Sequence, residues 1–241
     1  MSEKIRVTMY NEYAHEKTNP GAIKQYPNGI HNYIKDFLSV NPDFEITTVT
    51  LDIPECGLTE ELLNNTDVLL WWGHMRHGDV SDEVANRVKR RVLKGMGFIP
   101  LHSSHASKPF MLLMGTNCRL HWCDGHKEVL WTITPGHRIA KDVPEHFIID
   151  EEEMYGEPFG IPNPDEVVFI GWFNHGNVFR SGVTFRRGFG KIFYFQPGHE
   201  SNPTYHNKNV QKIIENAIYW AKPDYYPVQG EDFMAMDAIK L

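Results

Sequence analysis

The sequence predicts an α/β fold in which helices cover both faces of a mostly parallel sheet and short antiparallel hairpins extend that sheet. In the first half, strand-like and helix-like segments alternate, which is typical of parallel strands joined by right-handed crossovers. In the second half, short apolar runs are separated by Gly, Pro and Asn, as in hairpins. The length of 241 residues and the apolar fraction of 41% fit one globular domain.

The first half contains four strand-like runs. Residues 5–10 alternate in polarity, and residues 44–51 and 98–101 are short runs of strand-forming side chains. Residues 67–72 are nearly all apolar after Asp67, as expected of a strand that is buried on both faces. These runs predict parallel strands whose carboxyl ends share one edge of the sheet, where ligands bind in such folds.

Helix-like segments lie between and after these runs. Residues 30–38 carry an apolar face and follow a predicted long loop at residues 11–28. Ser81 is a predicted N-cap, and the helix that it begins ends at Gly95. Two further helices are predicted at residues 107–115 and 207–221.

The second half predicts five hairpin strands, at residues 128–134, 147–149, 167–173, 183–185 and 192–195. No break in composition divides the chain, so we expect residues 1–222 to form a single domain. Residues 223–241 are too apolar for a freely solvated terminus. We expect this tail to pack on the domain or on a neighbouring subunit of a homo-oligomer.

Charge and composition exclude several classes of function. With 24 basic and 31 acidic residues the formal net charge is −7, and no long basic block is present, so nucleic acid is not an expected partner. No stretch of about 18 apolar residues and no signal-peptide core is present, so no membrane association is expected. The 3 cysteines are an odd number without a secretory signal, which favours reduced thiols and a cytoplasmic protein.

Histidines, of which the chain has 13, gather at the predicted carboxyl ends of strands. His74 follows residues 67–72, His102 follows residues 98–101, and His199 follows a later apolar run. Neutral imidazole is a common ligand of Zn²⁺ and transfers protons near neutral pH. We therefore expect His74, His102 and His199 to bind a divalent metal, with zinc preferred, and His102 and His199 to act in catalysis.

Further residues near these strand ends are expected to contact a substrate. His77 and His105 each complete a His-x-x-His pair after a strand, and His15 lies in the loop after the first strand. Trp72 and Tyr155 carry rings that could stack on the face of a sugar.

An acidic segment and a sharp turn offer catalytic groups. Glu153 lies where acidic, aromatic and turn residues mix, and we expect it to act as a general base or as a further metal ligand. The turn after residues 98–101 resembles an elbow that exposes a nucleophile, so Ser103 or Ser104, with His102 or His105 as its base, is a candidate serine nucleophile. The Gly-x-Ser-x-Gly spacing is absent, which weighs against this alternative.

Five motifs occur in order along the chain: Trp71-Trp72-Gly73-His74, the elbow at residues 97–103, Gly136-His137-Arg138-Ile139, residues 147–156 and residues 190–199. Together they resemble the trehalose-utilisation (ThuA-like) family, over residues 4 to 221. The resemblance implies a class I glutamine amidotransferase-like fold, which is a flavodoxin-like three-layer α/β sandwich. It also implies a role in the use of trehalose or related disaccharides.

The resemblance also sets a limit on the chemistry. Amidotransferases of this superfamily carry a Cys nucleophile at the elbow and a His-Glu pair downstream. Here His102 occupies the elbow, and His199-Glu200 resembles the pair. Without the Cys, glutamine hydrolysis is excluded.

Two classes of function remain open. The first is an enzyme that acts on a disaccharide or its keto derivative in a His-rich, metal-binding cleft. Isomerisation, epimerisation or elimination is favoured over hydrolysis, because hydrolysis needs two carboxylates and only Glu153 is well placed. The second is a non-catalytic sugar-binding or regulatory protein on this fold, which would bind a sugar without turnover.

Overall fold

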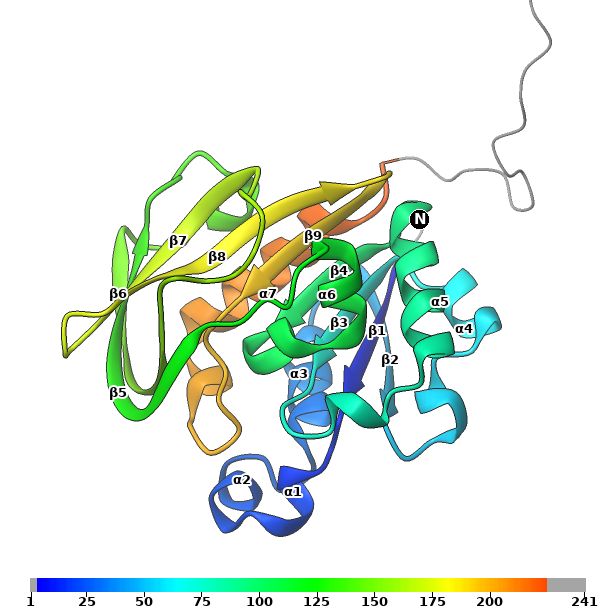
Figure 1. Cartoon of the computed structure of the whole chain (residues 1–241), viewed down its shortest axis with the longest axis horizontal. Helices are drawn as coiled ribbons and strands as arrows, with labels where there is room; N and C mark the ends of the chain where they lie inside the picture. Colours follow the sequence, from blue (N-terminus) through cyan, green and yellow to red (C-terminus); the bar gives the residue numbers. More distant parts are fainter. Residues whose placement is uncertain (1–3, 225–241) are drawn as a thin grey trace, which may run out of the picture.

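A computed structural model describes residues 4–224, and a nine-stranded sheet runs through it in the order β2-β1-β3-β4-β9-β8-β7-β5-β6 (Figure 1). Five neighbouring strands pair in parallel, namely β1 (Ile5–Asn11), β2 (Phe44–Thr50), β3 (Val68–Trp72), β4 (Gly97–Leu101) and β9 (Gly190–Phe195). The other four extend the sheet in antiparallel pairs, namely β5 (His121–Thr132), β6 (His146–Gly156), β7 (Glu166–Phe173) and β8 (Val178–Arg187). This arrangement is the α/β class that the alternation predicts.

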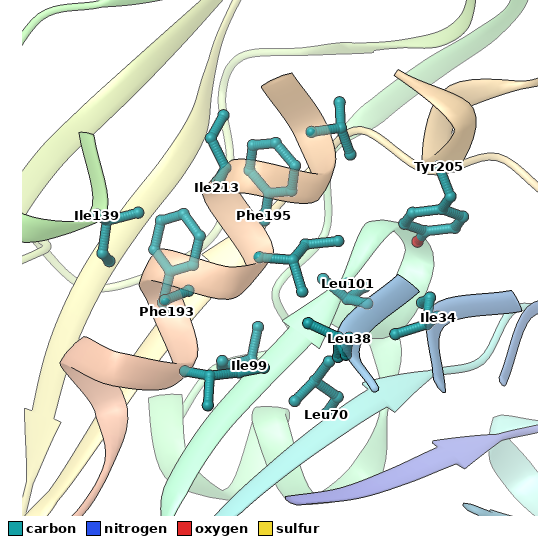
Figure 2. Close-up of a cluster of buried hydrophobic side chains, with 14 of the residues drawn as sticks. Ile34, Leu38, Leu70, Ile99, Leu101, Ile139, Phe193, Phe195, Tyr205 and Ile213 are labelled. Atoms are coloured by element: carbon teal, nitrogen blue, oxygen red, sulfur yellow. The ribbon is translucent and has the colours of Figure 1, made fainter. Parts of the chain in front are cut away.

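Helices cover both faces of the parallel strands. The longer ones are α3 (Ile30–Leu38), α5 (Asp82–Leu93), α6 (Lys108–Met114) and α7 (Lys208–Ala221). Side chains of α3 and α7 pack with Leu70 on one face (Figure 2), where Trp72 belongs to the same cluster. The helices α5 and α6 pack with Leu69 and Trp71 on the other face. Because successive side chains of β3 point to opposite faces, this strand is apolar throughout.

Local signals explain where several helices begin. The hydroxyl of Ser81 accepts a hydrogen bond from the N–H of Val84, so the predicted cap starts α5. The predicted loop at residues 11–28 instead holds two short helices, α1 (His15–Thr18) and α2 (Pro20–Gln25), and a third, α4 (Glu60–Asn64), precedes β3. Asn19 caps α2, with Pro20 in its first turn. Figure 1 shows α1 and α2 beyond the end toward which β1 runs.

The strands β5 and β6 are much longer than the predicted strands at residues 128–134 and 147–149. Their polar and charged residues break the alternation that predicts strands, but the two strands pair with each other along their length. One such pair joins Trp122 to Tyr155. The acidic segment at residues 150–153 is therefore part of a strand and not a loop.

The predicted tail lies mostly outside the described residues, which end at Asp224. At that end the Lys191 ammonium group lies 2.7 Å from the carboxylate of Asp224 and donates to the carbonyl of Trp220. Among residues 4–224, no helix has the length and apolarity needed to cross a bilayer.

Glu128 is a fully buried carboxyl group in the antiparallel part of the sheet. One of its oxygens accepts from the Ser181 hydroxyl at 2.8 Å, and the other has no hydrogen-bond partner among the described residues. Burial, together with the charge of Glu152, raises the pKa of Glu128 from 4.5 to about 8. The folded protein thus keeps a proton on Glu128 at neutral pH that the unfolded chain loses.

This proton makes stability depend on pH. The contribution of Glu128 is fully present below pH 4.5 and is lost as the pH rises through about 8, because only the unfolded carboxyl ionises over that interval. The melting temperature of Glu128→Gln minus that of the native chain at the same pH should therefore be higher at pH 8 than at pH 5. Thermal unfolding at both values checks this, with exposed Glu145→Gln as control. A difference that does not change with pH would contradict it.

Candidate active site

Imidazole rings gather beyond the carboxyl ends of the parallel strands. His74 follows β3, His102 follows β4, His199 follows β9, and His15 lies on α1 after β1. The ring centre of His102 lies 6.3 Å from that of His74 and 5.6 Å from that of His199. The long strand β6 reaches the same place and adds Glu153, whose carboxylate contacts His102. The structure therefore brings together the histidines that follow the strand ends.

His102 stands at the elbow, as the sequence predicts, and is completely buried. Its φ is 52°, in the left-handed region that side chains rarely adopt, so the turn is strained there. Nδ1 donates to the carbonyl of Gln196 at 2.8 Å, and Nε2 lies 2.9 Å from Oε2 of Glu153. Burial alone would lower the pKa of His102, but the hydrogen bond and charge of Glu153 outweigh burial and raise it to about 9. His102 is therefore an imidazolium that holds Glu153.

Glu153 lies at the wall of a cavity of about 460 Å³. Burial would raise its pKa, but the hydrogen bond and charge of His102 lower it overall, so Glu153 is a carboxylate at neutral pH. His199 lines the same cavity, and burial together with the charge of His102 lowers its pKa to about 4. The cavity thus presents a carboxylate beside a neutral imidazole, both of which can accept a proton.

A second group of ligand atoms lies beside this pair. His15 Nε2 is 2.7 Å from His74 Nδ1, and Glu200 lies 3.4 Å from His15 and 3.8 Å from His74. Burial, with the charge of His102, lowers the pKa of His74 to about 3. Oε2 of Glu200 is buried, has no hydrogen-bond partner in the described chain and lies 3.5 Å from His199. Two imidazole nitrogens and a carboxyl oxygen therefore lie within 4.8 Å of one another, and burial raises the pKa of Glu200 above its ordinary value.

Two buried carboxylates hold the loops that carry these histidines. Glu12 accepts hydrogen bonds from the backbone N–H groups of His74, Met75 and Arg76, at 2.8–3.1 Å. Glu152 accepts from the backbone N–H groups of Gly198 and His199, at 2.9 and 3.1 Å. Each carboxylate satisfies donors that would otherwise be left unpaired at the ends of β3 and β9.

Glu12→Gln tests this role. A Gln amide can accept fewer hydrogen bonds and turns an N–H₂ group toward backbone donors, so one to two buried N–H groups lose their partner. Each loss costs about 1–3 kcal/mol, and a chain of this size loses about 2–4 °C per kcal/mol, so we expect each lost partner to lower the melting temperature by about 2–12 °C. The exposed substitution Glu61→Gln is the control. A variant as stable as the control would show that Glu12 does not hold the loop.

Four predicted site residues take other places. Trp72 is completely buried and its indole N–H donates to the carbonyl of Gly198, so no ring face is open to a sugar. His77 lines a small pocket with Trp71 on the opposite face of the sheet. The Ser103 hydroxyl donates to the carbonyl of Gly73 and is not paired with an imidazole base. His105 Nδ1 donates to a backbone carbonyl, that of Cys118, and its ring packs edge-on against Tyr155.

Of the predicted metal ligands His74, His102 and His199, only His102 lies where it has no nitrogen to offer. Both nitrogens of His102 are engaged, one by a carbonyl and one by Glu153, so this ring has no lone pair to offer a metal. Tyr155 stacks on His102, its hydroxyl lies 3.4 Å from Nε2, and burial raises its pKa well above 10. These two buried residues support Glu153 from behind and do not line the cavity.

Several site residues were not among the predicted ones. Glu12 and Glu152 hold loops by accepting hydrogen bonds from backbone N–H groups, and no sequence motif marks a carboxylate with this role. Asp124 and Trp122 lie on the part of β5 that was not predicted as a strand, and both line the cavity. Glu200 follows His199 directly, and only its resemblance to a His-Glu pair pointed to it.

Comparison with known proteins finds a family whose profile covers most of the chain. The profile of a family described as trehalose utilisation (ThuA) matches residues 6–221. No protein in the curated set matches the chain.

Solved structures share the fold at low sequence identity. A ThuA-like protein from Parabacteroides merdae is 15% identical with a TM-score of 0.70, and the match covers 92% of each chain. A cytoplasmic protein from Salmonella typhimurium is 10% identical with a TM-score of 0.60, over 91% of this chain and 100% of that one. A glutamine amidotransferase from Thermotoga maritima is 8% identical with a TM-score of 0.56, over 91% and 98%. These likenesses confirm the amidotransferase-like, flavodoxin-type fold.

Proposed function

The chain belongs to the trehalose-utilisation (ThuA) family, and we propose that it is an enzyme that moves a proton next to the carbonyl group of a keto-sugar derived from a disaccharide. One observation carries the proposal. The carboxylate of Glu153 lines the cavity while the buried imidazolium of His102 holds it from behind at 2.9 Å. A carboxylate fixed at a cavity wall can act as a general base.

The proposed reaction is an isomerisation or an epimerisation. Glu153 takes the proton from the hydroxyl-bearing carbon next to the carbonyl, and the electrons of that C–H bond form an enediolate whose negative charge lies on the former carbonyl oxygen. When the hydroxyl proton passes to that oxygen and Glu153 returns its proton to the former carbonyl carbon, the carbonyl moves. When a proton instead returns to the other face of the first carbon, the carbonyl reforms in place and that carbon is inverted. No oxidant or co-reactant is needed. His199, neutral beside Glu153, can relay the proton.

We propose that His15, His74 and Glu200 hold a divalent metal, with zinc preferred. Two imidazole nitrogens and one carboxylate are a donor set that such ions accept, and the buried Oε2 of Glu200 lacks a hydrogen-bond partner in the described chain. A metal there would polarise a substrate carbonyl. The neutral state of His74 supports this assignment, because a metal ligand must be deprotonated.

We also propose that the enzyme works in the cytoplasm. Its three free cysteines fit a reducing compartment, and the related Salmonella fold is described as cytoplasmic.

Product analysis tests the proposed reaction. Trehalose and the ketone made by oxidising one of its secondary hydroxyls are each incubated with the protein and followed by NMR. We expect the ketone to change into an isomer with its glycosidic bond intact and trehalose to remain unchanged. Release of glucose from trehalose would support hydrolysis instead. Binding of either sugar without any conversion would support the non-catalytic alternative.

A further inference from the structure

The cavity has further lining residues that the proposed chemistry does not use. Trp122 lines it and is 64% exposed, more than any other tryptophan in the described chain. Its partner in the sheet register, Tyr155, is buried, whereas the ring of Trp122 faces solvent. An exposed indole beside a polar cavity is a flat apolar face on which a sugar ring can stack.

Further polar groups line the same cavity. Ser201 and Asn202 line the cavity, and no side-chain hydrogen bond is found for either within residues 4–224. Asn19 lines it as well, and its side-chain oxygen accepts from the N–H of Gly21 at 2.8 Å, so the amide N–H₂ group is left to donate. Asp124 adds a carboxylate that lies 3.9 Å from Nε2 of His199 and whose side chain is 71% exposed. Amides, a hydroxyl and a carboxylate are suited to the hydroxyl groups of a sugar.

We propose that Trp122, Asn19 and Asn202 form a subsite for the second sugar ring of a disaccharide substrate. The reacting ring lies against Glu153 and His199, and the other ring stacks on Trp122. Both sets of residues line one cavity of about 460 Å³, which is within the range of about 300–1,000 Å³ of small-molecule sites. The subsite makes the enzyme select disaccharides over single sugars. This inference rests on the proposed function, because it takes a sugar as the occupant.

Calorimetric titration with trehalose, its ketone and methyl α-glucoside tests the subsite. For the native chain we expect at least one of the two disaccharides to bind about tenfold tighter than methyl α-glucoside. Because the indole face is the stacking surface of the second ring, Trp122→Ala should weaken that disaccharide about tenfold, about 1.4 kcal/mol, and leave methyl α-glucoside within about twofold. Trp122→Tyr keeps a ring and should retain most of the affinity.

Trp172→Ala is the matched control, because Trp172 is 45% exposed and does not line the cavity. Equal affinity for one-ring and two-ring sugars, no disaccharide binding, or an unchanged disaccharide affinity in Trp122→Ala would each overturn the subsite. The outcome is separate from that of the proposed reaction. Tight disaccharide binding without conversion would support the subsite and contradict the proposed reaction. Conversion with a KM that Trp122→Ala does not change would support the reaction and contradict the subsite.

Discussion

Replacing Glu153 with Gln is expected to lower kcat for the keto-disaccharide about 10³-fold while KM changes less than about threefold. Gln keeps the volume and the contact with His102 but cannot take a proton. The effect should fall on kcat because the base acts in the transition state and not in binding. Steady-state kinetics followed by NMR measure both constants.

Glu151→Gln is the matched control, because Glu151 is an exposed neighbour on the same strand and does not line the cavity. Thermal unfolding of both variants separates a lost base from a lost fold, since Glu153→Gln leaves the buried His102 without its counter-charge. A folded Glu153→Gln protein that keeps more than about a tenth of the native kcat would show that another group is the base.

Replacing His74 with Ala is expected to abolish metal binding. The native chain, stripped with a chelator and then supplied with zinc, should retain about one equivalent, and the variant less than about a tenth of that, because one of three protein ligands is gone. Conversion of the keto-disaccharide should fall by about 10² or more. Elemental analysis after gel filtration measures the metal directly.

His146→Ala is the control for this change. His146 is exposed on β6, stacks on Trp131 with ring centres 4.5 Å apart, and does not line the cavity. If His74→Ala retained as much zinc as His146→Ala, the metal would belong to other ligands. If neither these variants nor the native chain retained zinc, His15, His74 and Glu200 would be a hydrogen-bonded cluster only.

The parallel half of the sheet could be predicted because each of its segments carries a local signal. The strand β3 is apolar on both faces, and the hydroxyl of Ser81 caps the helix that follows. The antiparallel extension gave weaker signals, because β5 and β6 carry charged side chains that break the alternation and depend on each other for pairing. Pairing between two strands that are distant in the sequence cannot be predicted from the residues of either strand alone.

The histidine cluster followed from the same logic, but the role of each side chain did not. Parallel strands end at one edge, which brings His74, His102 and His199 together. Which face a residue takes depends on register, so Trp72 turns into the core and His77 lies on the other side of the sheet. The hydrogen-bond partners of a side chain also cannot be predicted from sequence alone. Both ring nitrogens of His102 have partners, the carbonyl of Gln196 and the carboxylate of Glu153, and neither is near His102 in the sequence.

Solvent exchange tests the proton transfer most directly. The keto-disaccharide is incubated in D₂O with the native chain and with Glu153→Gln, and deuterium at the carbon next to the carbonyl is followed by NMR. We expect the native chain to incorporate deuterium there at least about 10²-fold faster than Glu153→Gln. Incorporation by the native chain that is no faster than by Glu153→Gln, in a protein that binds the ketone, would contradict the central claim.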